Sequence, residues 1–85
     1  MEVIWITDVK IFKDYILYLT FNDGVVKSFD VSTLLSGDNP LYLPLKDVSL
    51  FSNIKLDGWT VTWNNGEIDI APEFLYENGV TIAGI

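Results

Sequence analysis

The 85-residue sequence contains no cysteine, no histidine and no arginine. Without cysteine, neither a disulfide bond nor a thiolate metal site can stabilise the fold. Without histidine, the chain lacks the side chain that most often acts as a general base or binds a metal near neutral pH, and no serine can be activated by one. We therefore predict that the protein is not an enzyme and that it binds no metal and no other cofactor.

Positive charge is also scarce, because five lysines stand against twelve acidic residues and the net charge is −7. The lysines are scattered along the chain, whereas binding to phosphates needs clustered cations and arginine is the residue that reads guanine edges. We therefore expect no direct binding to nucleic acid.

Long apolar runs are missing as well, since none approaches the ~18 residues that a membrane-spanning helix needs. The first ten residues, MEVIWITDVK, have no basic segment ahead of their apolar residues and do not resemble a secretory signal. The expected location is the cytoplasm, with no membrane association.

Apolar and aromatic residues, by contrast, are abundant. The chain is 49% hydrophobic, with three Trp, four Tyr and five Phe, and its mean hydropathy of +0.30 is unusual beside a net charge of −7. A domain of this size cannot bury half of its residues. We expect part of the apolar surface to face another protein or a second copy of the chain in a homodimer.

Turn signals divide the chain into short segments that are typical of antiparallel strands. Asn22-Asp23-Gly24, Asp57-Gly58 and Asn64-Asn65-Gly66 are hairpin turns by composition. The expected strands are 3–6, 15–21, 25–29, 54–56, 59–63 and 67–70. The expected short helices are 31–35, a turn capped by Asp47, and 72–77.

These elements predict an α+β domain, a small twisted antiparallel sheet of about five to six short strands with short helices packed beside it. In the second strand, Ile16, Tyr18 and Thr20 share the face opposite Leu17 and Leu19, and this partly apolar face suggests that it is covered too. We assign residues 1–79 to a single domain. The apolar tail, residues 80–85, has three alternatives: an edge strand, a contact with a partner, or a frayed end.

Glu67 and Asp69 are a candidate pair of carboxylates, because residues two apart on a strand share a face, roughly 6–7 Å apart. Such a pair could serve a glycosidase or hold a hard cation. Alternation with buried Ile68 and Ile70 accounts for the same pattern without a site. We predict that both carboxylates face solvent and bind no metal.

Four aromatic residues are candidates for a ligand-binding or partner-binding surface: Trp59, Trp63, Phe74 and Tyr76. Together they could line a site for a small apolar or planar ligand. Aromatic residues at strand spacing are more often part of the core, and that alternative stays open.

An ordered set of motifs resembles the bacterial family known as domain of unknown function 2442. The motifs are F-N-D-G (21–24), F-D (29–30), P-L-K-D (44–47), Phe51 and W-N-N-G-E-I-D-I-A-P-E-F-L-Y (63–76). Members of the family close with W-x-N-G-x-D-[IL]-x-P-E-x-L-Y, and many of them have proline where this chain has Asn64.

The resemblance implies an α+β fold and a prokaryotic source. Some longer members continue into a helix-turn-helix DNA-binding domain, and stand-alone members are often encoded beside another small protein, as in toxin–antitoxin pairs. No catalytic residues are established for the family. We therefore expect a small non-enzymatic interaction or regulatory module, such as an antitoxin-like partner of a co-encoded protein. The alternative is a small-ligand-binding or sensor domain related to the forms that carry a DNA-binding domain.

Overall fold

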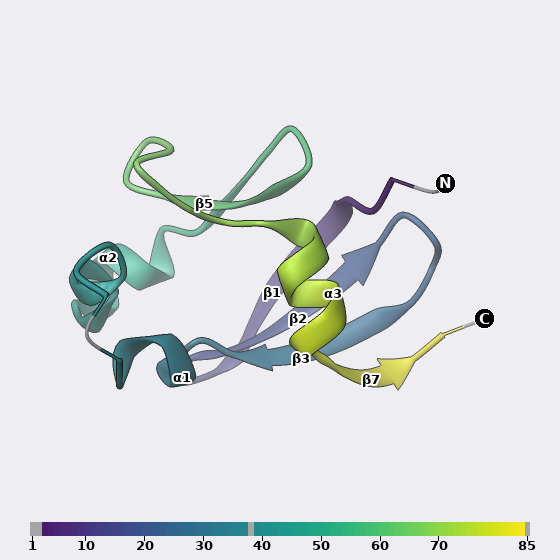
Figure 1. The fold of residues 1–85 in the computed structure, drawn as a ribbon, viewed down its shortest axis with the longest axis horizontal. Helices are drawn as coiled ribbons and strands as arrows, with labels where there is room; N and C mark the ends of the chain where they lie inside the picture. The colour runs from purple at the N-terminus through teal and green to yellow at the C-terminus, as the bar shows by residue number, and fades with distance from the viewer. Residues whose placement is uncertain (1–2, 38, 85) are drawn as a thin grey trace.

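The computed structural model describes residues 3–37 and 39–84, and within them the strands form two antiparallel sheets (Figure 1). The four-stranded sheet has the order β1 (Ile6–Lys13), β2 (Ile16–Phe21), β3 (Val26–Asp30), β7 (Val80–Ala83). The three-stranded sheet has the order β4 (Lys55–Asp57), β5 (Thr60–Trp63), β6 (Ile68–Ile70). The helical elements are α1 (Ser32–Leu35), the 3₁₀ turn η1 (Leu43–Lys46), α2 (Val48–Ser52) and α3 (Pro72–Asn78).

The predicted α+β class is confirmed, although the strands divide between two sheets instead of forming one. The first strand also differs from the expected range 3–6, because β1 runs from Ile6 to Lys13. Its pairing with β2 has two irregularities, between Ile6 and Asp8 and between Ile11 and Lys13. These bulges break the two-residue alternation by which a strand is identified in a sequence.

The core lies between the two sheets and is completed by side chains from every helical element. In Figure 1, α3 and the three-stranded sheet lie on the same side of the four-stranded sheet. The buried apolar residues are Ile6, Leu17, Leu19, Phe21, Phe29, Val31, Leu35, Leu45, Phe51, Val61, Trp63, Ile68, Ile70 and Leu75.

The turn between β5 and β6 holds three consecutive residues in the left-handed region, with φ of 54° at Asn64, 57° at Asn65 and 88° at Gly66. Asparagine and glycine tolerate this conformation better than other residues. Asn64 therefore suits this turn, whereas proline would not, since its ring fixes φ near −65°.

Helix α2 begins as predicted, with the Asp47 carboxylate accepting a hydrogen bond from the Ser49 backbone N–H at 2.9 Å. Helix α3 begins at the buried Pro72 and ends before Gly79. Gly79 has φ of −76°, so a left-handed conformation does not explain this glycine. Space does, because a Cβ at this position would lie 2.7 Å from the carbonyl oxygen of Leu75.

Residues 80–83 form the edge strand β7, which is one of the three alternatives left open for the tail, whereas Ile85 lies outside the described residues. Among the described residues, no helix has the length and apolar character required to cross a bilayer.

Candidate functional site

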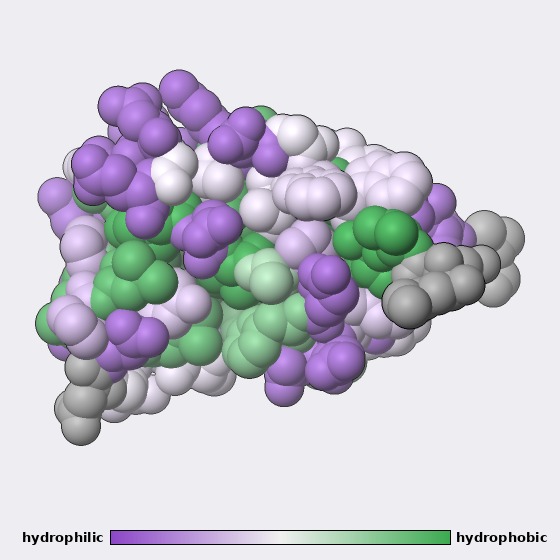
Figure 2. Space-filling view, turned by 45° about the horizontal axis from the view of Figure 1, so that its top comes forward, coloured by the Kyte–Doolittle hydropathy of each residue, from purple (hydrophilic) through white to green (hydrophobic). Residues whose placement is uncertain are grey.

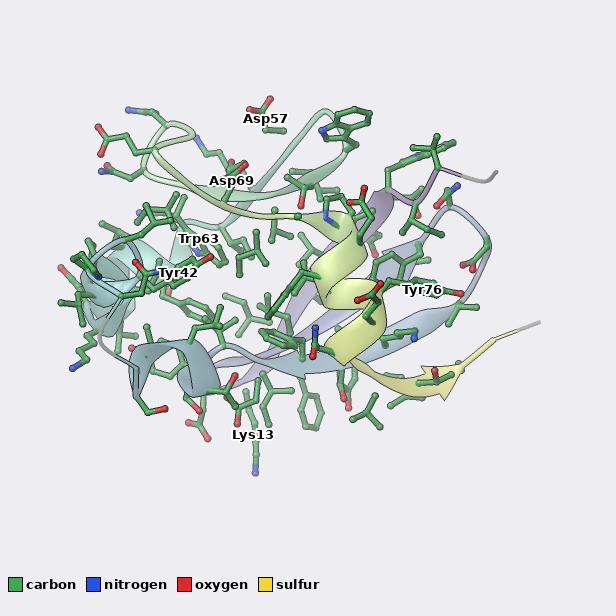
Figure 3. All side chains as sticks on the ribbon, in the orientation of Figure 1. Lys13, Tyr42, Asp57, Trp63, Asp69 and Tyr76 are labelled. Carbon is green, nitrogen blue, oxygen red and sulfur yellow. The ribbon has the colours of Figure 1, made fainter. Side chains whose placement is uncertain are left out.

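The four aromatic residues singled out in the sequence do not form one surface. Trp63 is only 1% exposed and belongs to the core (Figure 3). Its indole N–H donates to the Phe51 carbonyl at 3.0 Å, and the two rings stack with centroids 5.8 Å apart. Trp59 is 59% exposed and Phe74 is 40% exposed. Trp63 is therefore a core residue, and the other three have to be considered one by one.

Tyr76, the fourth of these residues, connects α3 to the four-stranded sheet. Its hydroxyl donates to the Asp23 carboxylate at 2.5 Å, and its ring packs edge-on against Phe21. The Lys27 ammonium lies 4.0 Å from the ring centroid and donates to the Tyr76 carbonyl at 2.6 Å. The hydrogen bond from Tyr76, followed by one from the Val25 backbone N–H, lowers the pKa of Asp23 below its usual value. These contacts give Tyr76 a structural role.

Glu67 and Asp69 are both exposed, and they belong to different elements. Glu67 precedes β6 and accepts a hydrogen bond from the Asn64 side chain at 2.8 Å, whereas Asp69 lies within β6 (Figure 3). Over residues 3–37 and 39–84, no group of three or more acidic, His or Cys side chains is placed to hold a metal ion.

Exposed and half-buried apolar side chains also lie on the outer face of the four-stranded sheet, which we call the open face. In β2, Leu17, Leu19 and Phe21 are almost fully buried, so Ile16, Tyr18 and Thr20 point to the other side. Cross-strand pairing adds residues of the three other strands to this side. The open face consists of Asp8, Lys10, Phe12, Lys13, Ile16, Tyr18, Thr20, Val26, Ser28, Asp30 and Val80.

No helix among the described residues lies on the open face, since α3 and the three-stranded sheet are both on the opposite side (Figure 1). Phe12 and Tyr18 stack at its centre, with ring centroids 4.6 Å apart and an interplanar angle of 8°. Phe12 is 54% exposed and Val80 is 66% exposed. The sequence indicated this face, because Ile16 and Tyr18 are apolar residues on the side of the strand opposite Leu17 and Leu19. The expected packing partner for this face is not found within the described chain.

The charges on the open face balance, in contrast to those of the whole chain. Asp8 and Lys10 are two apart on β1, and Lys13, Ile16 and Asp30 form one row across three strands. Lys13 points to the uncovered side in Figure 3. Two acids and two lysines therefore lie on this face, while the net charge of the chain is −7.

A second apolar feature lies around the turn between β4 and β5, where Val3, Trp5, Gly58 and Trp59 line a shallow hollow of about 530 Å³. We call it the tryptophan corner. Figure 2 shows this end of the molecule as pale and green atoms beside purple, hydrophilic ones. Trp5 is 39% exposed. It was not among the predicted surface residues, because residues 3–6 were expected to form a strand, whereas β1 begins at Ile6.

Hydrogen bonds hold the backbone of the tryptophan corner against two hairpin turns, the β4–β5 turn and the β2–β3 turn. The Ile6 N–H donates to the Trp59 carbonyl at 2.8 Å. On the other side, Asn22 accepts from the Trp5 N–H and donates to the Val3 carbonyl through its side chain, both at 2.9 Å. The segment before β1 is therefore held between two hairpin turns.

Two further hollows are present. One of about 390 Å³ lies where β7 stops pairing along β3. It is lined by Phe29 and Phe74 and by four residues of the open face, Ile16, Ser28, Asp30 and Val80. The other, of about 610 Å³, lies between α2 and the turn at 64–66 and has a mixed lining that includes Lys55 and Asp57.

Comparison with known proteins gives one match. A family model described as "Protein of unknown function (DUF2442)" matches residues 6–81, which is nearly the whole chain. No curated protein and no solved structure matches.

Proposed function

Because the chain belongs to the DUF2442 family of proteins of unknown function, we propose a role from its surfaces: it is a small non-enzymatic interaction module that forms a homodimer through the open face. The observation that carries this proposal is a four-stranded sheet whose outer face bears exposed apolar side chains, Phe12 and Val80 among them, and has no cover within the described chain. Contiguous exposed apolar patches of this kind mark protein interaction sites.

The size of the open face suits a modest dimer interface. Its strands have eight, six, five and four residues. At about 3.3 Å per residue and about 4.8 Å between strands, they cover about 360 Å² of flat sheet. Two such faces amount to about 720 Å² of flat sheet, to which the side chains add. This is smaller than the roughly 1,200–2,000 Å² that stable specific interfaces bury and suits a weak dimer. We therefore propose a dissociation constant in the micromolar range.

The charge distribution favours a second copy as the occupant of the open face. Two chains that each have a net charge of −7 repel one another over most of their surfaces. The open face carries equal numbers of acids and lysines, so this repulsion is smallest there. Face-to-face packing of two sheets with a closed two-fold axis gives a β-sandwich and leaves no open-ended contact.

The regulatory, antitoxin-like role that the family resemblance implies is compatible with such a dimer, because a dimer presents two copies of every remaining surface to a partner protein. The cytoplasm is the proposed compartment, since a chain without cysteine gains nothing from an oxidising environment.

The test is sedimentation of a matched pair of variants, Val80→Glu and Val48→Glu. Both valines are highly exposed, at 66% and 64%, but Val48 lies on α2, away from the open face. We expect the wild type and Val48→Glu to be dimers at about 100 μM, given a micromolar dissociation constant, and Val80→Glu to be a monomer with an unchanged circular dichroism spectrum. A monomeric wild type, or equal dimerisation of the two variants, contradicts the proposal.

A further inference from the structure

The tryptophan corner has exposed aromatic surface and negative charge side by side. A second hollow of about 260 Å³ shares Val3 and Trp59 with it and is also lined by Asp69 and Glu73. Both carboxylates are on exposed residues. The described linings of the two hollows contain no lysine.

We propose that the tryptophan corner binds an arginine side chain from a basic segment of a partner protein. A guanidinium group is planar, so it stacks on an indole ring, where the ring quadrupole attracts its charge. Its edge carries several N–H donors that can reach carboxylates at the same time. Trp59 provides the ring at this corner, and Asp69 and Glu73 provide the acceptors.

The composition favours a different protein as the occupant. No arginine occurs among the 85 residues, so a second copy of these residues provides no guanidinium. The net charge of −7 attracts a basic partner over longer distances and increases its rate of association.

The corner is also fixed before anything binds. The Trp59 carbonyl accepts from the Ile6 N–H at 2.8 Å, and Asn22 holds the backbone of Trp5 from the other side. Binding therefore orders little of the backbone, which reduces the entropic cost of association.

This inference rests on the proposed role as an interaction module, but it uses another surface, since no lining residue of the corner belongs to the open face. The two proposals can therefore fail separately. Val80→Glu tests the dimer and leaves the corner intact, whereas Trp59→Ala changes the corner and leaves the open face intact.

The experiment is a titration with the peptide acetyl-Ala-Arg-Ala-amide, followed by NMR of the three indole N–H groups. The same peptide with citrulline, which has the shape of arginine without its charge, is the neutral control, and a lysine peptide tests the preference for a planar cation. We expect the arginine peptide to shift the Trp5 and Trp59 signals and to leave the buried Trp63 signal in place. Citrulline and lysine peptides should bind at least fivefold more weakly.

Variants locate the site. Trp59→Ala and the double variant Asp69→Asn/Glu73→Gln should each weaken binding at least fivefold. The double variant Glu67→Gln/Glu77→Gln removes the same charge from exposed residues outside both hollows and should have no effect. Equal binding of the citrulline or the lysine peptide overturns the assignment to arginine, and so does equal loss in the two double variants. Sedimentation of Trp59→Ala should still give a dimer.

Discussion

Replacing Trp63 tests the structure most directly, because the chain offers a matched tryptophan with the opposite environment. Trp63 is 1% exposed and Trp59 is 59% exposed. We expect Trp63→Ala to lower the free energy of unfolding strongly and Trp59→Ala to change it little.

The magnitude follows from what Trp63 contacts. Truncating a buried tryptophan to alanine costs about 3–5 kcal/mol, because packing is lost and a cavity is left. The truncation also removes the donor to the Phe51 carbonyl. An 85-residue domain is stable by only about 4–13 kcal/mol. Trp63→Ala therefore removes a large part of the total stability, whereas an exposed substitution such as Trp59→Ala stays within about 0.5 kcal/mol.

The assay is urea unfolding followed by far-ultraviolet circular dichroism, at a single protein concentration because dimerisation adds to apparent stability. If Trp63→Ala does not fold, Trp63→Phe is the second variant. It keeps most of the apolar volume but removes one of the donors to the Phe51 carbonyl, which still accepts from the Ile54 N–H at 3.3 Å. The loss of this one hydrogen bond should cost about 0.5–1.5 kcal/mol. Equal losses for Trp63→Ala and Trp59→Ala, or an unchanged midpoint for both Trp63 variants, would refute the placement of Trp63 in the core.

Two further predictions concern α3. The lowered pKa of Asp23 means that its bond with Tyr76 stabilises the fold above about pH 4; in urea unfolding across pH, Tyr76→Phe should therefore be less stable than the wild type at pH 7, and the difference should shrink as the pH falls below 4. Gly79→Ala should cost about 1–3 kcal/mol, because its Cβ meets the Leu75 carbonyl oxygen at 2.7 Å. Gly37→Ala, whose nearest contact is 3.8 Å away, should be close to neutral, and equal effects on the melting temperature would contradict the steric argument.

The sequence predicted secondary structure best where one face of a strand is buried, or where a characteristic residue marks the start of a helix. β2 alternates regularly and was predicted almost to the residue, and the Asp47 cap was identified from composition alone. β1 was misplaced because bulges interrupt its alternation. The division into two sheets depends on contacts between segments that are distant in the sequence, such as the hydrogen bond from the Ile6 N–H to the Trp59 carbonyl. Such contacts cannot be predicted from local sequence patterns.

The candidate site was harder to predict because Trp59 was wrongly included in the strand that ends at Trp63. The predicted strand 59–63 gives Trp59 and Trp63 the same face, because side chains alternate between the two faces of a strand and these residues are four apart. In the structure β5 begins at Thr60, so Trp59 belongs to the turn that follows Gly58, whose φ is +71°. The two tryptophans consequently have opposite environments, and Trp59 is the one whose ring is exposed.

The closing stretch, residues 63–76, shows how one motif can serve both folding and binding. Its inward side chains, Trp63 and Leu75 among them, are buried and complete the core. Its outward side chains include Asp69 and Glu73, which line the hollow beside Trp59. Burial therefore accounts for only half of the stretch. The exposed residues of the stretch include the acids Asp69 and Glu73, which are not part of the core and which a cationic partner needs. We therefore propose a binding role for residues that alternation alone would assign to solvent.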